Sequence, residues 1–321
     1  MLYDVLLIGL GQIGMGYDYN HAVNEGVYTH ARAFNQHPNF QLVGGVDSDI
    51  SRGEMFESMY LCKSYSDLNE ALSNCQPHLV IIAVPTDLHF EILTAVLENI
   101  TPLAIMCEKP LAYELDTAKN IRKICVDKNV ALYVNYIRRS DPGVIEIKKR
   151  LDSGHISSPI KGICWYSKGL IHNGSHFFNL LEYWLGSMND AKVIEVGRLW
   201  DGADPEPDIQ LKFEKGTVMM IALDEENFSH SCIELLASNG RLRYDKGGAE
   251  IKWQSIEADS NFSGYKRLSN EPEKIMSGME RYQWNVAEQL ASALNGDKYE
   301  LCNDLEALTT LSNMQSIIEM R

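Results

Sequence analysis

Three shortages narrow what this chain of 321 residues can be. Its apolar runs are strand-length, far short of the roughly 20 residues that cross a bilayer as a helix, which argues against a membrane-spanning protein. Its seven cysteines are scattered and include no C-x-x-C pair, which argues against a disulfide framework and against a zinc or redox motif. Basic residues are few, 29 Lys and Arg against 44 Asp and Glu, so nucleic-acid binding, which needs a basic surface, is not expected.

What the chain does contain is typical of a compact globular protein. Its hydrophobic content is 45%, it has only 10 prolines, and its length is enough for two domains. The first apolar run begins almost at the first residue, which leaves no room for a signal peptide. We therefore expect a cytoplasmic protein with reduced cysteines and no membrane or nucleic-acid partner.

Up to about residue 135, strand-like and helix-like segments alternate, as in a parallel sheet with helical crossovers. The predicted strands are 3–9, 41–47, 79–84, 103–107 and 130–135. The predicted helices are 28–36, 51–60, 67–74, 87–99 and 114–128. The fold class expected here is α/β with a Rossmann-like parallel sheet, and we place this domain at residues 1–130.

After a helix at 142–153 the pattern changes to strands with few helices between them. The predicted strands are 160–167, 191–199, 208–213, 217–223, 232–237, 241–245 and 249–254, with a hairpin turn at 214–216. Helices are predicted at 174–185, 279–295 and 303–319, and a long loop at 257–278. Residues 131–321 therefore predict an α+β domain with a large, mostly antiparallel sheet, and its last helix is a candidate to pack on the first domain.

The first predicted strand ends in the motif G-x-G-x-x-G, within the stretch VLLIGLGQIG. In such a motif the first glycine, here Gly9, permits a tight turn and the second, Gly11, lets the backbone approach a pyrophosphate. The third, Gly14, lets the next helix pack closely on the strand. The motif is weak alone, so its context has to decide between a dinucleotide site and an ordinary glycine turn.

That context is an acidic residue, Asp47, at the end of the second predicted strand, where a carboxylate hydrogen-bonds the ribose 2′-hydroxyl of NAD. A carboxylate repels a 2′-phosphate, so NAD is favoured over NADP. The alternative is that Asp47 is only the N-cap of the following helix. The polar segment 16–27 lengthens the gap between the motif and Asp47, and we interpret it as an insertion that is either a solvated loop or a lid.

Two further strand ends carry candidates, because ligands of open α/β sheets bind at the carboxyl ends of strands. Thr86 and His89 follow the third predicted strand, and Glu108-Lys109-Pro110 follows the fourth. A residue before proline is biased toward extended geometry, which would fix how Lys109 projects. The alternatives are a capping or core role for His89 and a surface role for Lys109.

In the second half, His172 and His176 lie four residues apart in the segment 169–186. If the helix already includes His172, both side chains face one side. Two histidines at this spacing are compatible with a metal, but no third ligand is evident. We favour a base with a hydrogen-bonding partner and predict no metal site.

In their order and spacing these segments resemble the Gfo/Idh/MocA oxidoreductases, the family of glucose-fructose oxidoreductase and inositol dehydrogenase. The resemblance covers nearly the whole chain and rests on GLGQIG, Asp47, AVPTDLHFE, CEKP, NYIRRSDP, GSHFFNLLEYWLG and DLEALTTLSNMQSIIEM. It implies an NAD(H)-dependent oxidoreductase that transfers a hydride to or from a secondary hydroxyl or ketone of a sugar or nucleotide-linked sugar. It also implies a homodimer or homotetramer.

The resemblance assigns roles as well. Lys109 is expected near the nicotinamide and the substrate hydroxyl, where its ammonium would stabilise alkoxide charge, and His176 is expected to be the general acid/base. The family usually has Asp where His172 and Asn179 stand, so either His172 acts as a relay or the substrate differs. The segment before His172 is also shorter than in the family, which suits a larger, phosphate-bearing substrate.

These arguments give three sets of residues. The predicted cofactor contacts are Gly9, Gly11, Gln12, Ile13, Gly14, Asp47, Val84, Pro85, Thr86, His89, Glu108 and Lys109. The predicted substrate contacts are Tyr136, Arg138, Arg139, Lys168, His172, Asn173 and His176, although Arg138, Arg139 and Lys168 have the alternative of being surface charges. The predicted catalytic residues are Lys109, His176 and His172.

Two other functions of the same fold stay open at this point. One is an NAD-dependent glycosidase, which oxidises a sugar carbon transiently and recycles its cofactor in each turnover. The other is a non-catalytic regulator that binds NAD and a partner. The presence of both Lys109 and His176 argues against the regulator.

Overall fold

The computed structural model describes residues 1–22, 25–223, 228 and 230–320. The chain divides into two compact units. Unit 1 comprises Met1–Ser140 and Glu280–Thr309, and unit 2 comprises Asp141–Met279 and Thr310–Arg321. Unit 1 thus takes in segments on both sides of the second unit, whereas the sequence suggests a single cut after residue 130.

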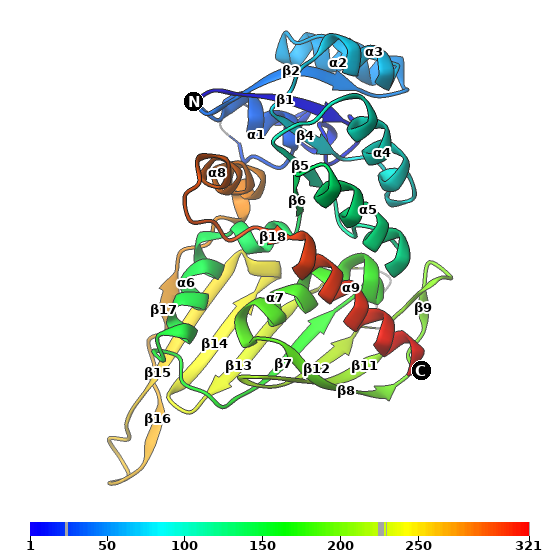
Figure 1. Cartoon of the computed structure of the whole chain (residues 1–321). Helices are drawn as coiled ribbons and strands as arrows, with labels where there is room; N and C mark the ends of the chain where they lie inside the picture. The colour runs from blue at the N-terminus through cyan, green and yellow to red at the C-terminus, as the bar shows by residue number, and fades with distance from the viewer. Residues whose placement is uncertain (23–24, 224–227, 229, 321) are drawn as a thin grey trace. The chain divides into compact units, whose positions relative to one another are not determined.

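Unit 1 contains a mostly parallel sheet flanked by helices (Figure 1). Its strands are β1 (Tyr3–Ile8), β2 (Phe40–Val46), β3 (Ser64–Tyr65), β4 (Leu79–Ile82), β5 (Ala104–Cys107), β6 (Ala131–Val134) and β18 (Cys302–Asn303). Its helices are α1 (His30–Gln36), α2 (Ile50–Tyr60), α3 (Leu68–Asn74), α4 (His89–Asn99), α5 (Leu115–Asp127) and α8 (Tyr282–Asn295), with the start of α9 (Asp304–Glu319). The predicted α/β class is confirmed.

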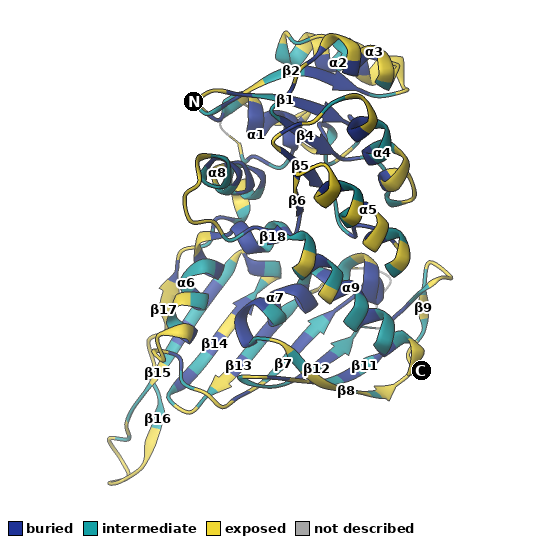
Figure 2. Cartoon of the chain, in the orientation of Figure 1, coloured by how far each residue is buried: buried dark blue, intermediate teal, exposed yellow. Residues whose placement is uncertain are grey.

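The strand order in this sheet is β18-β6-β5-β4-β1-β2-β3, and only β18 runs antiparallel to its neighbour. From β3 to β6 this is the order of a Rossmann dinucleotide fold, with its reversal between β1 and β4. Residues of β1 and β4 are almost entirely buried, as Figure 2 shows. On one sheet face, α1 and α8 complete a continuous apolar core through Phe34, Val286 and Leu290.

Unit 2 is built on a second sheet that is mostly antiparallel, as predicted. The strands of this sheet are β7 (Ile160–Tyr166), β8 (Met188–Glu195), β11 (Asp208–Phe213), β12 (Gly216–Ala222), β13 (Cys232–Ala237), β14 (Gly240–Asp245), β15 (Glu250–Ala258), β16 (Lys266–Leu268) and β17 (Glu273–Ile275). Strands β9 (Leu199–Trp200) and β10 (Asp204–Pro205) pair with each other in a separate two-stranded sheet. The other elements of unit 2 include α6 (Pro142–Asp152), η4 (Gly169–Gly174), α7 (Ser175–Leu185) and the end of α9.

Helix α7 covers one face of this sheet because its apolar stripe meets inward-facing strand residues. Phe178 contacts Phe213 of β11 with ring centroids 6.5 Å apart, and Trp184 contacts Tyr244 of β14 at 5.6 Å. The Trp184 indole also donates to the Val144 carbonyl of α6 at 3.1 Å. Along β14 buried residues alternate with more exposed ones, as expected for a sheet with one covered face (Figure 2).

Two details of the second half differ from the prediction and one agrees. The segment 257–278 is not a continuous loop, because β16 and β17 both pair with β15. These strands are short and polar, as edge strands often are, so they lack the apolar alternation that predicts a strand. The predicted hairpin at 214–216 is present, since Phe213 and Gly216 are paired. No helix in the described part of the chain is long and apolar enough to span a membrane.

Candidate functional site

A cavity of about 690 Å³ lies in unit 1 at the carboxyl ends of β1, β2 and β4, where the strand order reverses. Of the predicted cofactor contacts, its wall includes Gly9, Gly11, Gln12, Ile13, Asp47, Val84 and Pro85. It also includes residues that the sequence analysis did not single out, among them Tyr17, Ser48, Arg52 and Ser66. Ligands of open α/β sheets bind at this position, and the volume is that of a small-molecule site.

The glycine turn meets the steric demands that its spacing predicts. A Cβ on Gly9, whose φ is +97°, would lie 2.5 Å from the Ala83 carbonyl oxygen, and one on Gly14 would lie 2.1 Å from the Gly9 oxygen. A Cβ on Gly11, in contrast, would meet nothing within 4 Å. At Gly9 and Gly14 a side chain would therefore clash with the backbone, whereas at Gly11 the turn is open toward the cavity. The residues present fit a dinucleotide pyrophosphate.

Asp47 is held rigidly at the cavity wall. Its Oδ2 accepts a hydrogen bond from the Leu10 amide at 2.8 Å, its Oδ1 accepts one from the Asp49 amide at 2.9 Å, and Arg52 Nη1 lies 3.4 Å from Oδ2. The N-cap of α2 is Asp49, which accepts from Ser51, so the alternative of Asp47 as that cap is wrong. Asp47 instead joins the ends of β1 and β2, where a ribose would meet it.

Several other predicted contacts lie behind the cavity wall rather than in it. His89 is fully buried at the start of α4, with Nδ1 3.1 Å from the Leu111 oxygen and Nε2 3.0 Å from the Val84 oxygen. It links the chain after β4 to the chain after β5, so direct cofactor contact by His89 is corrected to a supporting role. Thr86, Glu108 and Lys109 are likewise not among the residues lining this cavity.

Glu108 is the centre of a buried polar cluster at the carboxyl ends of β5 and β6. Its Oε1 lies 2.7 Å from His30 Nε2 and accepts a hydrogen bond from Asn135 Nδ2 at 2.7 Å. Burial alone would raise the pKa of Glu108, but the His30 and Asn135 hydrogen bonds and the charges of His30 and Lys109 lower it below its ordinary value. The carboxylate is therefore ionised immediately before Lys109 in the chain.

The same cluster holds buried polar atoms that match a bound polar group or water. Gln283 Oε1 lies 3.4 Å from Asn135 Nδ2, which extends the cluster to α8. Within the part of the chain that the structure describes, His30 Nδ1, Asn135 Oδ1 and Gln283 Nε2 are buried without a hydrogen bond. Buried polar atoms are nearly always hydrogen-bonded, so these three atoms are candidates to contact a polar ligand or water.

The predicted catalytic residue Lys109 and the predicted substrate contacts of unit 1 differ in exposure. Lys109 and Arg138 are half-buried, whereas Tyr136 and Arg139 are buried. The Arg139 guanidinium lies 2.8 Å from Glu306 Oε1 and donates to the Glu300 carbonyl at 3.3 Å. Arg139 therefore secures the return of the chain to unit 1, and the prediction that it binds substrate is corrected on that ground.

In unit 2, the segment before α7 is a π-helical turn that two carboxylates hold in place. Asp204 accepts hydrogen bonds from the amides of Ile171 at 3.0 Å and His172 at 2.7 Å, and Glu206 accepts one from Gly169 at 3.0 Å. Burial raises the pKa of Asp204, against the lowering effect of these amides. The sequence analysis missed both residues, because they lie 32 to 37 positions further along the chain.

The two histidines occupy different structures. His172 lies in η4, exposed, and its ring stacks on Trp200 of β9 with centroids 4.7 Å apart. His176 lies half-buried in the first turn of α7, which begins only at Ser175. The condition for a shared helical face, an α-helix that already includes His172, is therefore not met.

The remaining predicted residues of this segment also have defined places. Lys168 is exposed and adopts a left-handed conformation, with φ of 64°, directly before η4. Asn173 Nδ2 donates to the Ser167 carbonyl at 2.9 Å. Asn179, which stands where the family has Asp, is buried and donates to Thr310 Oγ1 of α9 at 3.0 Å. Asn179 thus stabilises the packing of two helices.

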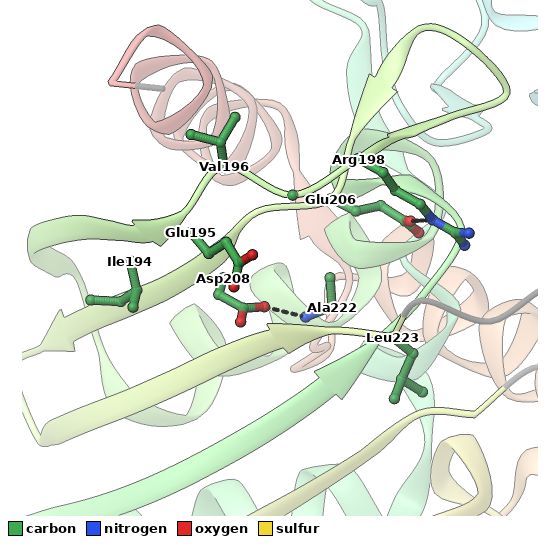
Figure 3. A pocket seen from close by; sticks show the side chains of 9 residues that line it. Ile194, Glu195, Val196, Arg198, Glu206, Asp208, Ala222 and Leu223 are labelled. Carbon is green, nitrogen blue, oxygen red and sulfur yellow. Dashed lines mark hydrogen bonds and ion pairs between the residues drawn. The ribbon is translucent and has the colours of Figure 1, made fainter.

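A second cavity, of about 730 Å³, lies in unit 2 where β8, β11 and β12 approach the β9–β10 segment. Figure 3 shows its acidic lining and the Arg198 side chain turned toward Glu206, with Nε 2.6 Å from Oε2. Asp208 accepts a hydrogen bond from the Ala222 amide at 2.9 Å. Two of its carboxylates are thus bound by the protein itself, and the described residues contain no group of three or more side chains placed to hold a metal.

Comparison with known proteins supplies the decisive observation. Residues 4–136 match the family model of the oxidoreductase family with an NAD-binding Rossmann fold, GFO_IDH_MocA. This segment, less than half of the 321-residue chain, is therefore similar to the NAD-binding domain of the Gfo/Idh/MocA oxidoreductases. The predicted resemblance and the predicted NAD cofactor are thereby confirmed, and the Gly9–Gly14 turn and Asp47 lie within the matched segment.

Curated relatives of this chain include two inositol dehydrogenases. An inositol 2-dehydrogenase of Mycolicibacterium smegmatis is 33% identical over 100 residues, covering 31% of this chain and 28% of the relative. A scyllo-inositol 2-dehydrogenase (NAD(+)) of Bacillus subtilis is 30% identical over 155 residues, covering 48% of this chain and 41% of the relative. The matches thus span less than half the length of these relatives.

Among solved structures, the WlbA dehydrogenase of Bordetella pertussis in complex with NADH and UDP-GlcNAcA is similar over the whole chain. Its TM-score is 0.75 at 17% identity, and the match covers 99% of this chain and 95% of that one. At this identity the likeness shows the fold alone. The shared fold includes unit 2, beyond the segment that the family model matches.

Proposed function

We propose that this protein is an NAD(H)-dependent oxidoreductase that transfers a hydride to or from a secondary hydroxyl or ketone of a sugar or nucleotide-linked sugar. The observation that carries this proposal is the cavity at the reversal of the unit 1 sheet, with Gly11 open toward it and Asp47 in its wall. The named relatives act on inositols, and a protein of the same fold was solved with a nucleotide sugar.

In this proposal the glycine turn holds the pyrophosphate and Asp47 accepts a hydrogen bond from the ribose. Bound NAD would supply the hydride acceptor, and NADH the donor. His176 takes the hydroxyl proton in oxidation and returns it in reduction, since an imidazole titrates near neutral pH. Lys109 stabilises the alkoxide charge that develops on the substrate oxygen.

The ionised Glu108 supports this role of Lys109. A carboxylate beside an ammonium favours the charged form of both groups, and the His30 and Asn135 contacts fix the carboxylate in place. On the other unit, Asp204 and Glu206 fix the backbone that leads into His176. We propose that His172, stacked on Trp200, contributes a polar edge and an aromatic face for substrate rather than a proton relay.

The experiment is a spectrophotometric screen at 340 nm with NAD or NADH and a panel of inositols, free sugars, nucleotide sugars and their keto forms. Turnover that depends on Lys109 and His176 supports the proposal, and a nucleotide sugar as substrate would define the class. Release of an aglycone from chromogenic glycosides without net NADH would favour the glycosidase. Tight NAD binding without turnover on any panel member would favour the regulator.

We also propose that the protein is a cytoplasmic homo-oligomer. On the sheet face of unit 2 opposite its buried residues, Met219 and Ile221 of β12 are only half-buried, which suits a surface that another copy covers. Light scattering on the purified chain tests this directly. A monomer at micromolar concentration would contradict it.

A further inference from the structure

The insertion between the glycine turn and α1 is organised around a buried aspartate. Asp18 is completely buried, and its Oδ2 accepts hydrogen bonds from the Thr29 amide at 2.8 Å, the Thr29 hydroxyl at 2.7 Å and the Tyr28 amide at 3.0 Å. These groups close the loop on itself at the start of α1, where Thr29 is the N-cap. The solvated-loop interpretation of this segment is therefore incomplete.

A buried arginine binds the described residues of the loop on both sides of positions 23 and 24. The Arg32 side chain is 7% exposed, and its Nε lies 3.7 Å from Asp18 Oδ2. Its two terminal nitrogens donate to backbone carbonyl oxygens of the loop at 2.8–3.3 Å: those of Asp18, His21, Ala22, Glu25 and Gly26. Charge-assisted bonds of this kind to main-chain acceptors fix a loop conformation in the absence of any ligand.

This fixed loop presents one tyrosine to the dinucleotide cavity. Tyr17 directly precedes Asp18, lines the cavity and is 54% exposed. Its amide donates to the Gln12 carbonyl at 2.9 Å, which ties it to the glycine turn. Tyr19, two residues on and 47% exposed, is not part of the cavity wall.

The loop also reaches toward the side of unit 1 where Glu108 lies. Val27 exchanges backbone hydrogen bonds with Glu280 at 3.1 Å and Gln283 at 3.2 Å, and the ring of Tyr28 lies 5.5 Å from that of Tyr282. Gln283, which directly follows Tyr282 in the chain, belongs to the Glu108 cluster. Asp47, at the end of β2, lies on the opposite side of β1 from β4 and β5.

We propose that Tyr17 is a cofactor-contacting residue whose ring packs against the nicotinamide of the dinucleotide, and that Asp18 and Arg32 are positioning residues that hold it there. This inference rests on the proposed dinucleotide site. An exposed aromatic ring at a cavity wall gains apolar contact and stacking when a flat ligand is bound. The insertion is then a built part of the cofactor site, not a lid that closes over it.

The test is NADH affinity, measured by the fluorescence of bound NADH, together with competition by ADP-ribose, which lacks nicotinamide. Tyr17→Ala should weaken NADH binding roughly five- to tenfold and leave ADP-ribose unchanged, whereas Tyr17→Phe should keep NADH affinity. Tyr19→Ala is the matched control and should leave both affinities unchanged. Equal loss for NADH and ADP-ribose, or no loss with Tyr17→Ala, would overturn the inference.

The positioning role has its own readout. Arg32→Lys keeps the charge but loses the fork of donors, so it should weaken NADH binding in the wild-type background and add nothing in the Tyr17→Ala background. Additive losses would show that Arg32 acts on general folding and would overturn its positioning role. If the wild-type chain bound no NADH, the proposed function itself would fail. If the wild-type chain bound NADH and Tyr17→Ala bound it equally well, only this inference would fail.

Discussion

Two turns of this chain have the same length and the same end residues, yet their amides are satisfied differently. Gly9–Gly14, reading GLGQIG, follows β1, and Gly169–Gly174, reading GLIHNG, follows β7. In the first, the hydrogen bonds described leave the amides of Gly11, Gln12 and Ile13 for a ligand. In the second, Asp204 and Glu206 already occupy the amides.

The difference teaches what turns a glycine-bounded turn into an anion site. Amides at the start of a helical segment attract negative charge in both places. In unit 1 these amides can donate hydrogen bonds to a bound molecule, whereas in unit 2 they donate to the carboxylates of Asp204 and Glu206. Consequently the first turn is the one we propose as a binding site, and the second is a support, held by protein carboxylates, for the segment that contains His172 and leads to His176.

The largest expected effect comes from removing the side chain of Lys109 or of His176. Lys109→Ala or His176→Ala should lower kcat by about 10²- to 10⁴-fold, because each removes a group that acts on the proton or on charge in the transition state. NADH affinity should change little. Initial rates at 340 nm with the substrate found in the screen measure this, and near-normal kcat in either variant would remove that residue from the proposal.

The next effect separates two glycines of the first turn. Gly14→Ala forces a Cβ to within 2.1 Å of a backbone oxygen and should destabilise the protein by about 1–3 kcal/mol or more. Gly11→Ala places its methyl group in open space, so the melting temperature should stay unchanged while NADH affinity falls about tenfold. Thermal melts and NADH titrations of both variants test the contrast. Equal behaviour of the two would contradict it.

The second turn should show the reverse pattern. Asp204→Ala leaves the amides of Ile171 and His172 without their acceptor and should cost about 1–3 kcal/mol of stability, with NADH affinity unchanged. Asp201→Asn, at an exposed position of the same segment, is the control and should be neutral. Chemical denaturation measures the difference. A loss of NADH binding in Asp204→Ala would mean that the two turns are not independent.

The smallest expected effect is on the pH dependence of stability, which should differ in sign between Glu108 of unit 1 and Asp204 of unit 2. The pKa of Glu108 is lowered, so the stability it contributes is present above its ordinary value of 4.5 and is lost as pH falls through its folded value. Burial raises the pKa of Asp204, so its ionisation costs stability as pH rises from its ordinary value of 3.8. Glu108→Gln should therefore flatten the acid loss of melting temperature, and Asp204→Asn should not. The opposite ranking in melts below about pH 5 would refute these assignments.

Local patterns in the sequence were enough to predict the N-terminal part of unit 1 and the cofactor. The apolar strands, the glycine turn and Asp47 depend on neighbours within a few residues, and each lies where its pattern places it. Asp47 and Asp49 show the limit of that reasoning. Both are acidic and precede α2. Only the folded structure shows that Asp49 is the N-cap, whereas Asp47 accepts a hydrogen bond from the Leu10 amide.

The features that escaped prediction depend on contacts distant in sequence. Nothing near His172 indicates that Asp204 will bind its amide, because the β9–β10 segment reaches it only in the folded chain. From the sequence, Arg32 is an ordinary polar helix residue. In the structure its guanidinium donates hydrogen bonds to the carbonyl oxygens of Asp18 and His21. From the sequence, Arg139 is a candidate phosphate ligand. In the structure its guanidinium forms an ion pair with Glu306. Polar residues are ambiguous in sequence because their partners decide their roles.

The return of the chain to unit 1 has a consequence for how the protein is made. Helix α8 and strand β18 complete the unit 1 sheet and core, yet the ribosome synthesises them only after all of Asp141–Met279. A nascent chain that ends at Ser140 lacks Val286 and Leu290, which cover one face of the sheet. We therefore expect unit 1 to complete its fold only after unit 2 has been synthesised, and a chain truncated at Ser140 to expose the apolar surface that α8 covers.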